Sequence, residues 1–172
     1  MDLKKSIRNV PDFPKPGVQF KDLTTLWKNP AALRESTDLL HRRYRDQAVD
    51  KVVGAEARGF IVGSPLAYLL GAGFVPVRKK GKLPADVVEI TYELEYGTDT
   101  IAMHRDAVRQ GERVLVVDDL LATGGTLQAM VDLVRKLGGE VVEACVLVEL
   151  VFLKGKEQLN APLFSLLTYE QE

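Results

Sequence analysis

The chain alternates short apolar runs with longer segments in which apolar residues recur at helical spacing. Residues 114–117 form an unbroken run of β-branched and aliphatic side chains, typical of a strand buried on both faces of a parallel sheet. The apolar residues from Leu127 to Leu137 then follow a helical period. Similar patterns predict strands over 51–55, 74–78, 140–149 and 164–168, and helices over 29–47 and 60–70.

The segment 29–47 carries clear helix signals. Asn29 can cap the helix, and Pro30 suits its first turn because proline lacks an N–H group that the first turn could not satisfy anyway. The residues expected along its buried face are Leu33, Thr37, Leu40 and Tyr44.

Strands that alternate with helices predict an α/β fold with a mostly parallel central sheet flanked by helices. Two extended runs, 87–94 and 98–104, interrupt the alternation, and we expect them to leave the sheet as a flexible β-flap within 79–104. No repeat, low-complexity tract or linker divides the sequence. We therefore expect one domain over 1–172.

Composition narrows the function classes. The chain has 172 residues, 46% hydrophobic and 27% charged, which suffices for one hydrophobic core. Its net charge of −1 offers no basic surplus for nucleic acid or an anionic membrane. We expect the lone Cys145 to be buried, and neither a signal sequence nor a membrane-spanning run is evident, so a cytoplasmic protein is expected.

The most informative chemistry follows the run 114–117. Asp118 and Asp119 end this strand, and the small residues of 122–126 open the next helix. Free N–H groups and the helix dipole favour a phosphate there, while the carboxylates can accept hydrogen bonds from ribose hydroxyls. The loop has no Gly-Lys-Ser/Thr and no G-x-G-x-x-G, which argues against a P-loop or a dinucleotide site. A plain helix cap and turn is the alternative interpretation.

Two further segments lie at the same predicted edge of the sheet. Arg58 follows the strand 51–55 and offers a planar fork for phosphate oxygens, although a solvated loop arginine is the alternative. The run 78–84 places four cations within five residues, so it could neutralise a pyrophosphate or be a solvated charged loop. Phe20, after the Pro/Gly turn 13–17, could stack on a base, although a structural role suits the prolines better.

Together these segments resemble the adenine phosphoribosyltransferase family of type I phosphoribosyltransferases. The stretch 114–126 is similar to the phosphoribosyl pyrophosphate motif, and 78–84 is similar to the family's Arg-Lys-x-Gly-Lys-Leu-Pro. Leu94-Glu95-Tyr96-Gly97 matches a Leu-Glu-Tyr-Gly segment of the family's mobile loop. The resemblance spans 13–167 and implies the type I phosphoribosyltransferase fold, with 1–28 as a base-binding hood and a non-proline cis peptide near Glu56-Ala57-Arg58.

The resemblance also implies roles for the site residues. Asp118 and Asp119 would hold the ribose hydroxyls and face a ribosyl cation, and Glu95 would assist proton removal. The 5-phosphate would lie on Ala122, Thr123, Gly124, Gly125 and Thr126. Pyrophosphate would meet Glu56, Ala57, Arg58, Arg78, Lys79 and Lys82. Adenine would be bound by Gln19, Phe20, Lys21 and Leu120, with Lys21 standing where many relatives have Arg.

The implied reaction joins adenine to the ribosyl group of phosphoribosyl pyrophosphate, giving AMP and pyrophosphate in purine salvage. Mg²⁺ would arrive on the pyrophosphate oxygens, so no dedicated protein metal site is expected. Arg78 would reach the active site of a partner subunit, which implies a homodimer. His41 and His104 have no catalytic partner in the sequence, and we expect both to be structural.

Two other functions stay open at this point. A non-catalytic sensor of phosphoribosyl pyrophosphate would use the same fold, but this chain has no length left for an added nucleic-acid-binding part. Hypoxanthine, guanine or xanthine could replace adenine, but the lysine and acidic or aromatic pair expected after the last strands is missing.

Overall fold

A seven-stranded sheet forms the centre of the protein in this computed structural model, which describes residues 1–94 and 96–172. Its strands are β3 (Lys51–Ala55), β4 (Gly73–Lys79), β5 (Val87–Glu93), β6 (Thr98–His104), β7 (Arg113–Leu121), β8 (Glu140–Leu150) and β9 (Leu163–Tyr169). The strand order is β5-β6-β4-β3-β7-β8-β9. Strands β4, β3, β7, β8 and β9 are parallel, which confirms the predicted mostly parallel sheet.

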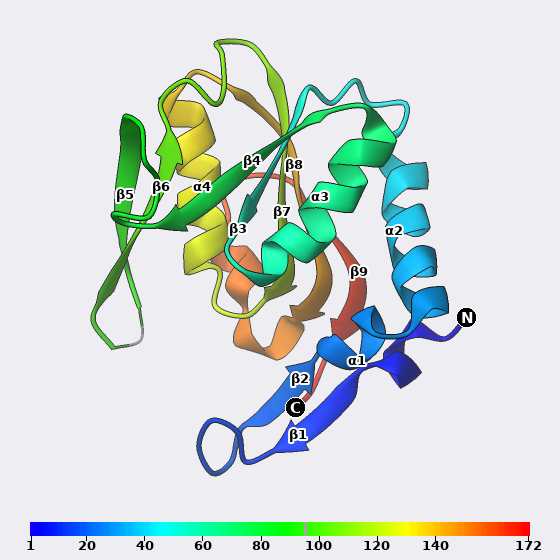
Figure 1. Ribbon diagram of the computed structural model, residues 1–172. Coiled ribbons are helices and arrows are strands. Elements are labelled where there is room, and N and C mark those ends of the chain that lie inside the picture. Colours follow the sequence, from blue (N-terminus) through cyan, green and yellow to red (C-terminus); the bar gives the residue numbers. More distant parts are fainter. Residues whose placement is uncertain (95) are drawn as a thin grey trace.

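Helices cover both faces of the sheet, as predicted. Helices α2 (Pro30–Tyr44) and α3 (Arg58–Leu70) lie on one face, and α4 (Gly125–Lys136) lies on the other (Figure 1). Two separate apolar clusters result, since α4 packs with Val116 and Val146 whereas α2 and α3 pack with Leu115 and Leu147. The alternating side chains of β7 and β8 thus supply both cores, which is why their sequences lack polar alternation.

The predicted buried face of α2 is only half right. Asn29 caps the helix as expected, since its side chain accepts from the N–H groups of Ala31 at 3.0 Å and Ala32 at 3.2 Å. The buried line runs through Ala32, Ser36, Leu40 and Tyr44, whereas Leu33 and Thr37 are half-buried. The small side chains of Ala32 and Ser36 allow the helix to approach its neighbours closely, and apolar periodicity alone did not reveal this.

The amino-terminal segment forms a small separate sheet. Strands β1 (Arg8–Pro11) and β2 (Gln19–Asp22) pair antiparallel, between the short 3₁₀ helix η1 (Leu3–Ser6) and the four-residue helix α1 (Thr24–Trp27). Figure 1 shows this hairpin beyond the carboxyl ends of the parallel strands. The sequence predicts only a turn and one extended segment here, because each strand has four residues and little apolar pattern.

The hairpin of β5 and β6 does not leave the sheet completely. Strand β6 pairs antiparallel with the end of β4, where Arg78 lies opposite Ala102 and Lys79 opposite Ile101. The predicted excursion is therefore an antiparallel extension of one sheet edge (Figure 1). This pairing fixes the hairpin beside the cationic run 78–82, which begins with the last two residues of β4.

The lone cysteine and the two histidines lie in the body of the fold. Cys145 is buried on β8 as predicted, and burial raises the pKa of its thiol to about 12. His41 and His104 are half-buried, and the Nε2 atom of His104 accepts from the N–H group of Ala85 at 3.4 Å. Among the described residues, no helix is long and apolar enough to cross a membrane.

Candidate active site

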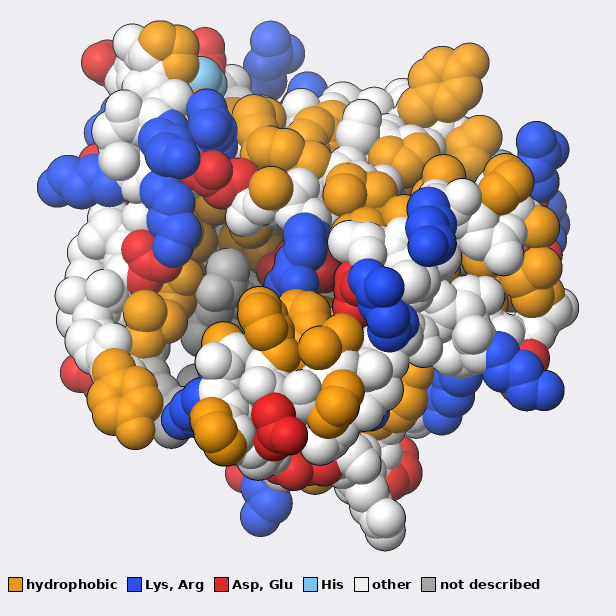
Figure 2. Space-filling view, turned by 60° about the horizontal axis from the view of Figure 1, so that its bottom comes forward, with side chains coloured by type: hydrophobic (Ala, Val, Ile, Leu, Met, Phe, Trp, Pro, Cys, Tyr) orange, Lys and Arg blue, Asp and Glu red, His pale blue; other side chains and the backbone are white. Residues whose placement is uncertain are grey.

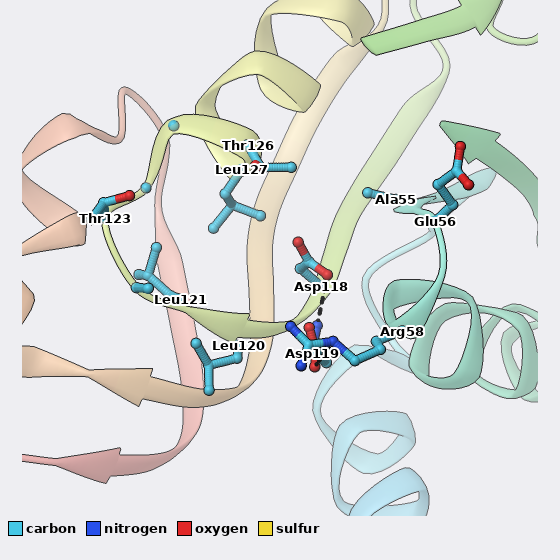
Figure 3. A pocket seen from close by; sticks show the side chains of 13 residues that line it. Ala55, Glu56, Arg58, Asp118, Asp119, Leu120, Leu121, Thr123, Thr126 and Leu127 are labelled. Atoms are coloured by element: carbon cyan, nitrogen blue, oxygen red, sulfur yellow. Dashed lines mark hydrogen bonds and ion pairs between the residues drawn. The ribbon is translucent and has the colours of Figure 1, made fainter. Parts of the chain in front are cut away.

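The acidic pair lies at the carboxyl end of β7, the edge at which open α/β sheets bind ligands. Asp119 is buried, and its N–H group donates to Asp118 Oδ1 at 2.9 Å. A Cβ atom at Gly59 would lie 3.0 Å from Asp118 Oδ1, so the start of α3 approaches this carboxylate closely. Figure 3 shows both aspartates and Arg58 at one cavity.

The two carboxylates are poorly solvated and close to each other. Burial, and then the charge of Asp119, raise the pKa of Asp118 well above its usual range. Burial also raises the pKa of Asp119, although Arg58 opposes this shift from 3.1 Å, measured from its Nε atom to Asp119 Oδ2. The pair is thus suited to stabilise positive charge that forms beside it.

The predicted phosphate loop borders the same cavity, whose volume is about 250 Å³. Gly124 adopts a left-handed conformation with φ of +91° and immediately precedes α4, so the helix amino terminus faces the cavity. This end of a helix attracts anions because its first N–H groups lack helical partners. The lining residues include Asp118, Asp119, Leu120, Ala122, Thr123, Gly124, Gly125 and Thr126, so the structure brings all of these predicted residues together.

The turn after β3 lies opposite this loop. Its Glu56-Ala57 peptide bond is cis, which confirms the expectation of a non-proline cis peptide there. The helix α3 begins at Arg58, two residues before the predicted start at Phe60. The side chain of Arg58 therefore projects from the first residue of a helix toward Asp119.

The predicted pyrophosphate-binding cations are all paired with acidic side chains. Glu56 lies 3.5 Å from both Arg78 and Lys82, and Lys79 pairs with Asp99. The N–H group of Lys79, at 2.7 Å, is the largest cause of the lowered pKa of Glu56. The Glu56 carboxylate therefore holds two of these cations in place and does not itself bind an anion. An incoming anion must compete with Glu56 and Asp99 for the cationic side chains.

A second, mostly apolar pocket lies under the amino-terminal hairpin. The rings of Phe13 and Phe20 pack edge to face with centroids 5.1 Å apart, and Arg58 lies 6.0 Å from the Phe20 ring. Val10, Asp22 and Thr24 complete its lining. Phe20 therefore shares this lining with Arg58, which also lines the first cavity.

The side chains of Gln19 and Lys21 are not among the residues that line this apolar pocket. Lys21 Nζ donates to Asn9 Oδ1 at 2.9 Å and lies 4.9 Å from the centre of the Tyr169 ring. Gln19 Oε1 accepts from Asn9 at 2.6 Å. Both side chains fasten the hairpin, so any contact of these residues with a base would come from their backbone.

Two residues that belong to none of the predicted motifs shape the phosphate loop. A Cβ atom at Gly155, the first residue of the 3₁₀ helix η3 (Gly155–Gln158), would lie 2.3 Å from the carbonyl oxygen of Ala122. Tyr92 on β5 reaches the loop from the other side, with its hydroxyl 2.9 Å from Thr126 Oγ1. A single glycine and one strand tyrosine carry no motif, and only the three-dimensional packing identifies them.

The candidate proton acceptor Glu95 lies outside the described residues. Within the described part of the chain, no group of three or more His, Cys, Asp or Glu side chains could hold a metal ion.

Figure 2 shows the site as a hollow with Lys and Arg side chains around its rim and acidic side chains beside them. The described residues thus offer a cavity for an anionic sugar ligand.

This combination of a parallel sheet, an acidic pair at the end of a strand and a helix-opening phosphate loop defines a phosphoribosyltransferase. The family model described as Phosphoribosyl transferase domain matches residues 22–162. The adenine phosphoribosyltransferase of Geotalea daltonii is 57% identical over 169 residues, covering 98% of this chain and 99% of the relative.

Solved structures agree with this class. The adenine phosphoribosyltransferase of Thermoanaerobacter pseudethanolicus is 49% identical, with a TM-score of 0.94 and coverage of 98% of each chain. The Saccharomyces cerevisiae enzyme, solved with an imino-altritol bisphosphate and adenine, is 41% identical, with a TM-score of 0.91 and coverage of 96% of each chain. The chain belongs to the adenine phosphoribosyltransferase family.

Proposed function

We propose that the protein transfers the 5-phosphoribosyl group of phosphoribosyl pyrophosphate to N9 of adenine, releasing AMP and pyrophosphate. The observation that carries this proposal is the cavity in which Asp118 and Asp119 lie opposite the phosphate loop. One ribose 5-phosphate can place its hydroxyls on the carboxylates and its phosphate on the helix amino terminus. The apolar pocket beside Phe20 accepts the base.

In the reaction, the bond between C1′ and the pyrophosphate oxygen breaks while a bond between C1′ and adenine N9 forms. Positive charge develops on the ribosyl group, where the carboxylates of Asp118 and Asp119 stabilise it. Arg58, Arg78, Lys79 and Lys82 stabilise the negative charge on the leaving pyrophosphate, and the proton of N9 is removed. Glu95 is the residue to which we assign that proton, because a carboxylate can accept it as a general base.

The donor set of the cavity also fits a magnesium ion that enters with the ligand. Two adjacent carboxylates share one arginine, and Asp118 offers a hard oxygen ligand of the kind Mg²⁺ prefers. When bound, Mg²⁺ supplies positive charge that offsets the negative charge of the pyrophosphate group.

The base pocket supports adenine as the acceptor. The Phe20 ring stacks on the purine, Leu120 forms an apolar wall, and backbone groups of Gln19 and Lys21 bind the polar edge of the base. Because the Lys21 side chain is occupied by Asn9 and Tyr169, its difference from arginine does not change the base contact. The yeast relative with bound adenine supports the same choice.

A transfer assay tests this function. We expect AMP and pyrophosphate to form when the protein is incubated with phosphoribosyl pyrophosphate, Mg²⁺ and adenine, and no nucleotide to form with hypoxanthine, guanine or xanthine. Chromatography of the nucleotide products measures both results. Tight binding of phosphoribosyl pyrophosphate without any product would instead support a sensor, and a product from another base would refute adenine specificity.

A homodimer is part of the proposal. Helices α2 and α3 expose an apolar groove lined by Leu33, Ile61, Pro65, Tyr68 and Leu69, and 85% of the Tyr68 surface is exposed. A second copy of the chain covers this groove. We expect Tyr68→Asp to weaken dimerisation at least about 30-fold, because a buried charge replaces an aromatic contact, while Tyr68→Phe keeps the dimer. Sedimentation velocity over a concentration series measures this, and a dimeric Tyr68→Asp variant would rule out the groove.

A further inference from the structure

Tyr92 holds the amino terminus of α4 from the side of the hairpin. Its hydroxyl lies 2.9 Å from Thr126 Oγ1, and a Cβ atom at Gly125 would lie 3.2 Å from the Cδ2 atom of its ring. Tyr92 therefore touches both of the first two residues of α4, and Gly125 leaves room for the ring. Tyr92 and Thr126 also line a cavity of about 320 Å³, together with Lys79 and Asp99.

The surroundings of Tyr92 favour one direction for its proton. The other possible acceptor, Asp99 Oδ2, lies 3.4 Å away and already pairs with Lys79, while Asp99 Oδ1 accepts from the N–H group of Thr100 at 2.8 Å. Thr126 is thus the nearer and less occupied partner. Burial raises the pKa of Tyr92, which keeps the phenol protonated and able to donate.

We infer that Tyr92 is a positioning residue for the 5-phosphate, because its hydroxyl donates to Thr126 and leaves the Thr126 proton free to point into the cavity. A hydroxyl that accepts one hydrogen bond becomes a better donor in a second one, because the first bond polarises its O–H group. The hydrogen bond from Thr126 to the phosphate is therefore strengthened. The strand that carries Tyr92 thereby sets the direction of a donor in the phosphate loop. This inference rests on the proposed function and adds a residue outside the phosphate loop itself.

The test is Tyr92→Phe, which removes one oxygen atom and keeps the ring against Gly125. We expect the Kd and KM for phosphoribosyl pyrophosphate to rise about fivefold, the usual effect of losing one hydrogen bond. The KM for adenine and the melting temperature should change little, since Tyr92 lies beside the phosphate loop and not among the residues that line the base pocket. Titration calorimetry with phosphoribosyl pyrophosphate and steady-state kinetics measure these quantities.

Thr91→Val is the matched control on the same strand. Its hydroxyl is 2.7 Å from that of Thr100 and exposed, so its loss should leave both KM values unchanged. In a Thr126→Val background, Tyr92→Phe should have no further effect, because the proposed action passes through the Thr126 hydroxyl.

Three results would overturn the inference: an unchanged Kd in Tyr92→Phe, an equal rise in the KM of both substrates, or additive effects with Thr126→Val. The wild-type titration separates these outcomes from failure of the proposed function. If the wild-type protein does not bind phosphoribosyl pyrophosphate at all, the proposed function fails, and the inference fails with it.

Discussion

Replacing Asp118 by asparagine is expected to lower kcat by at least about a hundredfold, because one of the two charges facing the ribosyl cation is lost. Asparagine has nearly the same shape, and its side-chain oxygen can still accept from the N–H group of Asp119. The loss would therefore reflect charge and not a collapsed loop. Steady-state kinetics with phosphoribosyl pyrophosphate, adenine and Mg²⁺ measure the effect.

The same substitution is expected to make the ligand-free protein more stable at pH 7. Burial and the Asp119 carboxylate raise the pKa of Asp118 above its usual 3.8, so the folded state binds this proton more tightly than the unfolded state. The stability of the wild type must then fall as the pH rises above 3.8 toward the pKa of the folded state. Asp118→Asn has no such proton to lose, so its advantage should appear at neutral pH and disappear in acid.

Urea unfolding between pH 4 and pH 8 tests the stability half of this prediction. Asp106→Asn is the control, because Asp106 is exposed in the turn after β6. The activity and the stability of this variant should therefore match those of the wild type closely. Full activity in Asp118→Asn would remove Asp118 from the proposed chemistry. A variant less stable than the wild type at pH 7 would show that the acidic pair contributes to folding.

The parts of the site that could be predicted from the sequence are those whose functional residues are neighbours along the chain. Asp118, Asp119 and the loop 122–126 are contiguous and follow an apolar strand, so the direction of the strand alone places them at the ligand edge. The parallel core was predictable for the same reason, since β7 and β8 show their burial in unbroken apolar runs. Arg58 followed from its place after β3.

The rest depends on partners that are distant in the sequence. Glu56 appeared as part of a pyrophosphate loop, yet its carboxylate holds Arg78 and Lys82, which lie more than twenty positions further along the chain. Lys21 appeared beside the base, yet Asn9 and Tyr169 bind its amino group because β1 and β9 flank it in space. Local patterns specify which residues reach an edge, whereas side-chain pairing there is decided by tertiary neighbours.

Gly155→Ala is expected to damage the phosphate loop even though Gly155 belongs to no motif. The added Cβ atom would lie 2.3 Å from the carbonyl oxygen of Ala122, and a Cβ atom at Gly124 would lie 2.4 Å from the carbonyl oxygen of Gly155. Gly155 thus packs directly against the backbone of Ala122 and Gly124, and neither segment can yield without moving the loop. We expect the free energy of unfolding to fall by about 1–3 kcal/mol. The KM for phosphoribosyl pyrophosphate should rise at least about tenfold, because displacing donors by a fraction of an ångström weakens every phosphate contact together.

Gly73→Ala provides the matched control, because an added Cβ atom there meets only the flexible Lys51 side chain, at 3.0 Å, at the opposite edge of the sheet. Urea unfolding and the KM values of both substrates distinguish the outcomes. If Gly155→Ala loses stability but keeps the KM for phosphoribosyl pyrophosphate, the contact supports the fold alone. If that KM rises while the KM for adenine is unchanged, η3 forms the rigid support that keeps the loop amides directed at the phosphate, a role that only a residue without a side chain can fill at this distance.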